Sequence, residues 1–226
     1  MEQPETPTRL TGAVRELASR VVSALNGGDH FVVVGGVVDA TDAEGADRLG
    51  LAAVRVLGAD TVLPSVLLRT APAPGDLTAF EQAVRGFPPA PDASPTSRWS
   101  HWAMRRTLGL DGAEPDTTWL DVAPWQVLTH QLAVLAALAV PGTDSGVARA
   151  AARRPVDVAR GFVRAVRRRD WLQAAGAGRW LSLLDGVPDT LALDTGLEFV
   201  ALMGGTDPRV ALQVRAARLL RAGAPV

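Results

Sequence analysis

WQVLTHQLAVLAALAV, residues 125–140, is an apolar stretch with only four strongly polar side chains: Gln126, Thr129, His130 and Gln131. Apolar residues fall on every side of the helix that it predicts, which is typical of a helix in a protein interior. A bilayer span needs roughly 18 or more apolar residues, so the stretch predicts a buried core helix rather than a membrane segment. We expect the rest of the chain to pack around it.

One side of this helix carries its polar residues. Gln126, Thr129 and His130 share a face at about 100° per residue, and Ala133 and Ala137 continue it. A polar strip that runs into small residues can line a pocket, or it can let a second helix approach closely. Both alternatives stay open from the sequence.

Helical periodicity and helix-capping signals extend over most of the chain. The residues that predict helix boundaries are Leu10 to Leu25 followed by Asn26-Gly27-Gly28, Thr41 with Glu44, Asp76 with Gly86, Gly109, Asp121 before residues 125–140, Pro141-Gly142, Pro155, Asp170 with Gly176, and Asp207-Pro208. These signals predict a mainly α-helical protein, an orthogonal or irregular bundle around residues 125–140.

Residues 31–68 allow a second interpretation. FVVVGGVV, residues 31–38, predicts a hairpin, a single buried strand or a helix, since valine is a strand former. A small strand–helix–strand unit over 31–68 is therefore an alternative, although Pro64 argues against a central strand.

The chain length and its proline distribution bear on the domain organisation. With 226 residues we expect a single helical domain over 1–226. The proline-rich segment 87–96 could divide it into two lobes, 9–86 and 97–223, or could form a lid.

Composition excludes several kinds of chemistry. The chain contains no Cys, Tyr or Lys, so thiolate, tyrosine and Schiff-base mechanisms are absent, and acid–base chemistry falls to Asp, Glu and the histidines at positions 30, 101 and 130. The histidines lack metal-ligand spacing, and no phosphate-binding loop or hydrolase motif occurs, so we expect no metal and no cofactor. A net charge of −1 gives no general attraction to nucleic acid or membranes.

The same sequence features suggest a cellular setting. The first residues, MEQPETPT, are acidic and proline-rich and contain no apolar signal region, so we expect a cytoplasmic protein. A lysine-free chain rich in Ala, Val, Leu and Gly is typical of a GC-rich bacterial genome, in which specialised biosynthesis is a reasonable setting.

His130 is the first candidate for a catalytic group. Burial on an apolar helix would lower its pKa, and Gln126 and Thr129 could orient a ligand beside it. In the alternative, His130 is a core residue bonded to a carbonyl or to Gln126. His101, Asp121 and Glu198 are the other acid–base candidates; Glu198 would lie either on a solvent face or against an arginine.

Two further groups of residues predict ligand contacts. Trp99, Trp102, Trp119 and Trp125 flank an acidic loop, and together with Arg105 they could line a pocket for a hydrophobic molecule; core packing is the alternative. Arg160, Arg164, Arg167 and Arg168 fall on one side of the helix that begins at Pro155. They suit a phosphate or a carboxylate, or they form a solvated face.

These features leave two functional hypotheses. In the first, the protein binds a hydrophobic small molecule and is a cofactor-independent acid–base enzyme of the cyclase, isomerase, dehydratase or lyase type. In the second, it is a non-catalytic helical module that binds another protein, with a homodimer as one form of that interaction.

Overall fold

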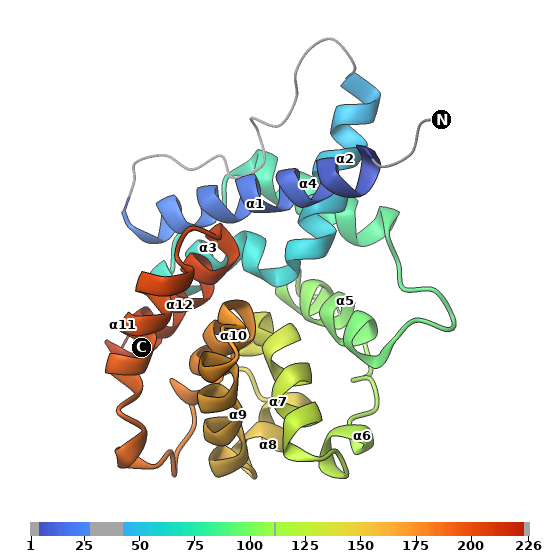
Figure 1. Cartoon of the computed structure of the whole chain (residues 1–226). Coiled ribbons are helices and arrows are strands. Elements are labelled where there is room, and N and C mark those ends of the chain that lie inside the picture. Colours follow the sequence, from blue (N-terminus) through green and yellow to red (C-terminus); the bar gives the residue numbers. More distant parts are fainter. Residues whose placement is uncertain (1–4, 28–42, 111, 224–226) are drawn as a thin grey trace.

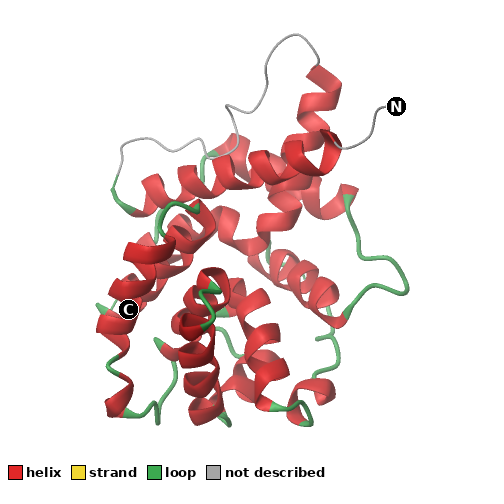
Figure 2. Cartoon of the chain, in the orientation of Figure 1, coloured by secondary structure: helices red, strands yellow, loops and turns green. Residues whose placement is uncertain are grey.

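A computed structural model describes residues 5–27, 43–110 and 112–223 (Figure 1). Every regular element in this part of the chain is a helix (Figure 2). The elements are α1 (Glu5–Leu25), α2 (Ala43–Leu57), η1 (Gly58–Val62), α3 (Leu63–Leu68), α4 (Pro74–Gly86), α5 (Pro95–Thr107), α6 (Thr118–Asp121), α7 (Trp125–Val134), η2 (Ala136–Leu138), α8 (Gly146–Ala152), α9 (Pro155–Arg167), α10 (Trp171–Leu181), η3 (Asp189–Leu191), α11 (Leu193–Gly204) and α12 (Pro208–Arg221). The predicted mainly helical, orthogonal bundle is confirmed.

The alternative strand unit over residues 31–68 is only partly within the described residues. Residues 31–38, which gave rise to it, lie outside them. From residue 43 to residue 68 the chain is helical, and Pro64 lies in the first turn of α3, where its missing N–H costs no hydrogen bond.

The helix enclosed by the bundle is α10 rather than the whole stretch 125–140. Residues 174–181 of α10 are all buried, and α10 contacts α7, α9, α11 and α12 (Figure 1). In α7, Leu128, Thr129 and Leu132 are buried, whereas Val127 and Val134 are exposed. The prediction of one helix buried on every side is therefore wrong.

The stretch also changes conformation halfway. Helix α7 ends at Val134, and a 3₁₀ turn follows before Pro141. Two side chains of α10 satisfy backbone carbonyls there: the Trp180 indole N–H donates to the Leu132 carbonyl at 2.7 Å, and Arg179 Nε donates to the Ala139 carbonyl at 3.1 Å. Tertiary hydrogen bonds thus take over where the helix stops.

Small residues let α9 and α10 approach α7 closely. A Cβ on Gly161 would lie 2.1 Å from Thr129 Cγ2, and one on Gly176 would lie 2.7 Å from the Ala133 carbonyl oxygen. Of the two alternatives for the strip on residues 125–140, close helix packing is the one observed here. Gly176 consequently lies inside α10, and the prediction that it ends the helix is wrong.

Predicted capping residues elsewhere in the described chain match some helix ends and not others; Thr41, predicted to cap the helix at 43–57, lies outside the described residues. The Asp170 carboxylate accepts from Gln173 N at 3.2 Å and Asp207 accepts from Arg209 N at 3.0 Å, as predicted. Asp121 does not cap α7, because it ends the short helix α6 and pairs with Arg153 instead. Asp76 lies in the first turn of α4, since the helix already begins at Pro74.

The apolar core consists of two clusters. One lies mainly under α1 to α4, and the other gathers residues of α5 to α11. Helix α12 contributes to both, through Val210 and Val214 on one side and Leu212 and Ala216 on the other. The division into lobes at residues 87–96 stays a prediction.

A buried polar network joins the two clusters. Arg179 Nη1 of α10 lies 2.7 Å from Asp60 Oδ1 of η1 and donates to Gln213 Oε1 of α12 at 2.9 Å. Gln213 Nε2 in turn donates to Asp60 Oδ2 at 2.7 Å. The arginine and aspartate side chains are 0% and 3% exposed, so three distant segments meet at an ion pair shielded from water.

One stretch of the described chain, Arg48–Leu68, is long and apolar enough to cross a membrane by length and composition alone. Half of that window is buried inside the fold. Core helices pass the same test, so the stretch is weak evidence for a membrane protein.

Candidate binding groove

A groove of about 540 Å³ lies between α9, the first residue of α7 and the segment around η3. Its lining consists of Trp125, Val156, Ala159, Arg160, Val163, Arg164, Arg167, Pro188, Thr190 and Leu191. Small-molecule sites commonly have volumes of about 300–1,000 Å³, so the groove is large enough for a small ligand.

The helical repeat of α9 decides which residues reach the groove. Ala159, Val163 and three arginines recur at spacings of three and four residues and share one side of the helix. The opposite side carries Gly161 and the buried Phe162, which pack toward α7 and α11. The groove therefore has an apolar floor with guanidinium groups along it.

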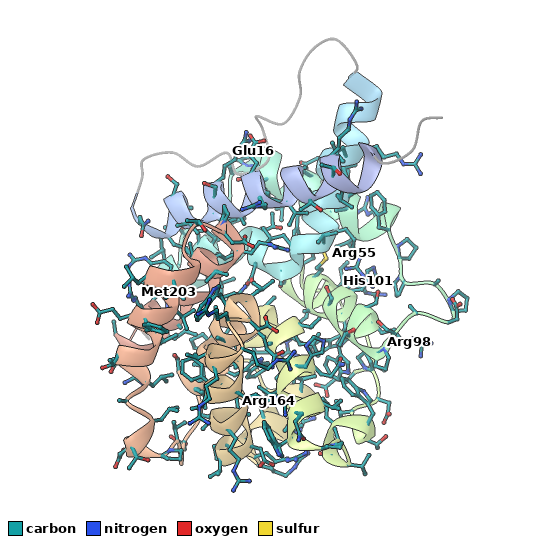
Figure 3. The ribbon with its side chains drawn as sticks, viewed as in Figure 1. Glu16, Arg55, Arg98, His101, Arg164 and Met203 are labelled. Atoms are coloured by element: carbon teal, nitrogen blue, oxygen red, sulfur yellow. The ribbon has the colours of Figure 1, made fainter. Side chains whose placement is uncertain are left out.

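Trp125 and Arg164 are in direct contact at the groove. The guanidinium carbon of Arg164 lies 5.5 Å from the centre of the Trp125 ring, within range of a cation–π interaction. Figure 3 labels Arg164 in the part of the molecule formed by α7 and α9. This contact holds the guanidinium in place without neutralising its charge.

The three arginines of the groove differ in their ionic partners. Arg160 Nη1 lies 3.3 Å from Asp157 Oδ1, and Asp157 also pairs with Arg154 at 2.8 Å. Within the described residues no carboxylate lies within 4.0 Å of the Arg164 or Arg167 guanidinium. Two positive charges at the groove therefore lack a nearby counter-charge from this part of the chain.

The chemistry of this lining is that of binding. A guanidinium fork donates paired hydrogen bonds to a carboxylate or a phosphate, and it stays protonated at any ordinary pH. The described lining residues include no His, Asp or Glu that could transfer a proton near neutral pH.

The four predicted acid–base residues lie on four different helices, outside this groove. His130 is exposed on α7, with Nδ1 3.3 Å from Gln173 Oε1, so the expected burial of His130 is wrong. Asp121 on α6 pairs with Arg153, and Glu198 is exposed on α11, which corresponds to its solvent-face alternative. A catalytic role for any of them stays a prediction.

His101 is half-buried on α5 and bridges to α4. Its Nε2 lies 3.1 Å from the Val84 carbonyl oxygen, and since a carbonyl only accepts, Nε2 carries the proton. Burial lowers the pKa of His101; the carbonyl bond opposes this shift, and the charges of Arg55 and Arg105 add to it. Arg55, for which no sequence pattern predicts a role, donates to the Phe87 carbonyl, to the Ser97 carbonyl and to Ser100 Oγ, and so ties α2 to α5.

The four tryptophans are not brought together at the groove. Trp99 and Trp102 are buried, with ring centres 4.9 Å apart. The indole N–H groups of Trp99 and Trp119 both donate to the Asp116 carbonyl, at 3.1 and 2.9 Å, and that of Trp102 donates to the Gly112 carbonyl at 3.4 Å. Three of the four thus hold the loop before α6 in place, and Trp125 alone among them lines the groove.

The remaining predicted ligand contacts have mixed positions. Gln126 is exposed beside Trp125. Thr129 is buried and its hydroxyl lies 2.8 Å from the Trp125 carbonyl of α7 and 3.3 Å from the Asp157 carbonyl of α9, so it serves the packing of α7 on α9. Arg105 lies on α5 near Gly112.

The acidic loop serves the fold in its described part. The Glu114 carboxylate accepts from Gly146 N at 2.9 Å and pairs with Arg149 at 3.1 Å, while Asp116 accepts from the Thr118 hydroxyl at 2.7 Å. In the part of the chain that the structure describes, no three His, Asp or Glu side chains are close enough to hold a metal ion.

The sequence contained a signal for half of this groove. Helical spacing and residue type predict Trp125 and three of the four stripe arginines, whereas Arg168, the fourth, lies outside the groove lining. Pro188, Thr190 and Leu191, which close the other side, carry no such signal, because only the path of the chain after α10 brings them to α9.

No known protein family, no characterised protein and no solved structure matches the chain.

Proposed function

We propose that the protein binds an amphipathic small molecule in the groove between α7, α9 and η3. The observation that carries this proposal is the combination of a volume of about 540 Å³ with an apolar floor and a half-exposed tryptophan. Transfer of an apolar chain from water to such a floor contributes about 25 cal/mol per Å² of buried apolar surface.

Binding of eight-carbon amphiphiles, measured by isothermal titration calorimetry, tests the proposal. Octanoate and 1-octanol are the probes, and Val156→Trp is the variant that fills the groove. Val156 is 46% exposed, so the larger ring meets open space rather than the core. Val127→Trp is the matched control, because Val127 is also 46% exposed but lies outside the groove.

We expect wild type and Val127→Trp to bind at least one probe, and Val156→Trp to bind it at least about tenfold more weakly, a difference of about 1.4 kcal/mol. Absence of binding by wild type, or equal affinities of the two variants, would contradict the proposal.

Catalysis by a cofactor-independent acid–base enzyme is a separate proposal from ligand binding. A cofactor-independent reaction would need one of His130, His101, Asp121 or Glu198 to reach the ligand, and these residues lie outside the described groove lining. Binding without turnover is therefore the function that the geometry supports best. A cytoplasmic, bacterial biosynthetic setting remains part of the proposal from composition.

The second candidate function is a helical interaction module in the form of a homodimer. Its support is the exposed apolar face of α11, where Phe199, Leu202 and Met203 are 45%, 80% and 48% exposed. An apolar patch is complementary to itself, as a two-fold interface requires. Sedimentation velocity tests it: a concentration-dependent dimer that Leu202→Glu abolishes supports this candidate, and a monomer at high concentration contradicts it.

A further inference from the structure

We infer that the ligand carries one oxyanion, a carboxylate or a phosphate monoester, which Arg164 and Arg167 hold while its apolar part lies on the groove floor. This inference rests on the proposed function and names the chemical class of the ligand.

The three arginines of the groove differ in the counter-charge that lies beside them. Asp157 is 3.3 Å from Arg160, and it supplies part of the counter-charge there. Arg164 and Arg167 have no described carboxylate within 4.0 Å, so an anion entering the groove meets two guanidinium groups that need not break an ion pair first.

Arg164 and Arg167 lie three residues apart on α9. Residues three apart on a helix are surface neighbours, with Cβ atoms about 5–6 Å apart, and like charges at that spacing repel each other. An oxyanion between the two guanidinium groups removes this repulsion and accepts charge-assisted hydrogen bonds from both.

Apolar side chains surround the two guanidinium groups. Arg164 lies over the Trp125 ring, and Ala159, Val163 and Leu191 lie beside the arginines. A molecule with an anionic head and an apolar body satisfies both halves of the lining, whereas inorganic phosphate satisfies only the charged half. Nucleic acid would need a larger basic surface than three arginines on a chain of net charge −1.

Calorimetry with four ligands that share an eight-carbon chain tests the inference: octanoate, octyl phosphate, 1-octanol and octyltrimethylammonium. The proteins are wild type, Arg164→Gln, Arg167→Gln and the matched control Arg168→Gln. Arg168 is the next residue after Arg167, is exposed and lies outside the groove lining. Each of the three substitutions removes one positive charge, and circular dichroism verifies that each variant is folded.

We expect wild type to bind the two anions at least about tenfold more tightly than octanol, because charge-assisted hydrogen bonds are stronger than those to a neutral hydroxyl. Arg164→Gln and Arg167→Gln should each weaken anion binding about tenfold and leave octanol binding within about twofold. Arg168→Gln should change neither by more than about twofold.

Several results would overturn the inference. If octanol or the ammonium compound binds as tightly as octanoate, and the Arg164 and Arg167 variants have no effect, the inference that the ligand carries an oxyanion is refuted. The proposed function would remain intact. Inorganic phosphate is a further probe: if it binds as tightly as octyl phosphate, the apolar floor contributes nothing.

Phosphatidylglycerol vesicles test the alternative of a membrane surface. If the vesicles capture the protein and Arg168→Gln weakens this capture as much as Arg164→Gln does, the basic face binds a membrane instead. Failure of all four ligands would instead refute the proposed function itself.

Discussion

Replacement of Arg179 by methionine should destabilise the protein by several kcal/mol. The substitution keeps an unbranched apolar stem of similar course and removes the guanidinium. Asp60 would then retain only the Gln213 amide, and the Ala139 carbonyl would lose its donor. Loss of one partner of a buried ion pair typically costs about 3–5 kcal/mol, because the other charge stays in the interior without compensation.

The side-chain exposures of Arg179 and Asp60, and the hydrogen bonds of Arg179, decide where the expected destabilisation lies within about 3–5 kcal/mol. Side-chain exposures of 0% for Arg179 and 3% for Asp60 leave little solvent to screen the remaining carboxylate. Arg179 Nη2 is itself buried without a partner among the described residues, so methionine also removes one desolvated group. We therefore expect the lower end, about 3 kcal/mol in the free energy of unfolding. For a chain of this length the fall in Tm is about 6–12 °C, at about 2–4 °C per kcal/mol.

Urea unfolding followed by circular dichroism is the assay. A thermodynamic cycle adds Asp60→Asn and the double variant to Arg179→Met. We expect the double variant to be more stable than the sum of the single effects predicts, by about 0.5–3 kcal/mol, because the charge left by one substitution is removed by the other. Asp194→Asn is the control. Its pair with Arg221 has exposures of 75% and 36%, and its loss should cost less than about 1 kcal/mol.

Two results would refute this reasoning. A loss below about 1 kcal/mol for Arg179→Met would mean that the pair contributes no more than a surface ion pair. Strict additivity of the two single substitutions would mean that Arg179 and Asp60 do not interact in the folded protein.

Two further predictions follow from the packing and from His101. Gly161→Ala should lower the free energy of unfolding by at least about 1–3 kcal/mol, since its Cβ would lie 2.1 Å from Thr129. Gly12→Ala, whose Cβ would meet no neighbouring side chain within 4 Å, should instead stabilise the exposed part of α1 by about 0.5–1 kcal/mol. Thermal unfolding of both variants is the measurement, and equal effects would contradict the packing argument. The lowered pKa of His101 means that the unfolded chain binds its proton more readily below about pH 6.5, so the free energy of unfolding should fall as the pH drops from 7.5 to 5.5. His101→Gln should show a smaller fall in urea titrations at the two pH values, and an unchanged fall would contradict this role.

Part of the candidate site could be predicted from the sequence. Arg160, Arg164 and Arg167 share a helix face by spacing alone, and residue type predicts a ligand contact for Trp125. His130 shows where such reasoning fails, because the sequence cannot tell whether the face that carries a polar residue is turned toward the core or the solvent. The tryptophans fail for a related reason: Trp99 is as apolar as Trp125, and only the packing of α5 against the rest of the bundle places Trp99 in the core.

The sequence by itself determined that the described chain is helical and where most helices begin, because capping and periodicity are local interactions between residues a few positions apart. Only the tertiary structure decided that α10 is the enclosed helix, that Asp60 meets Arg179, and that residues after α10 close a groove over α9. These features depend on contacts between distant segments. Their partners are selected by the shape and burial of the whole bundle, which no local pattern contains.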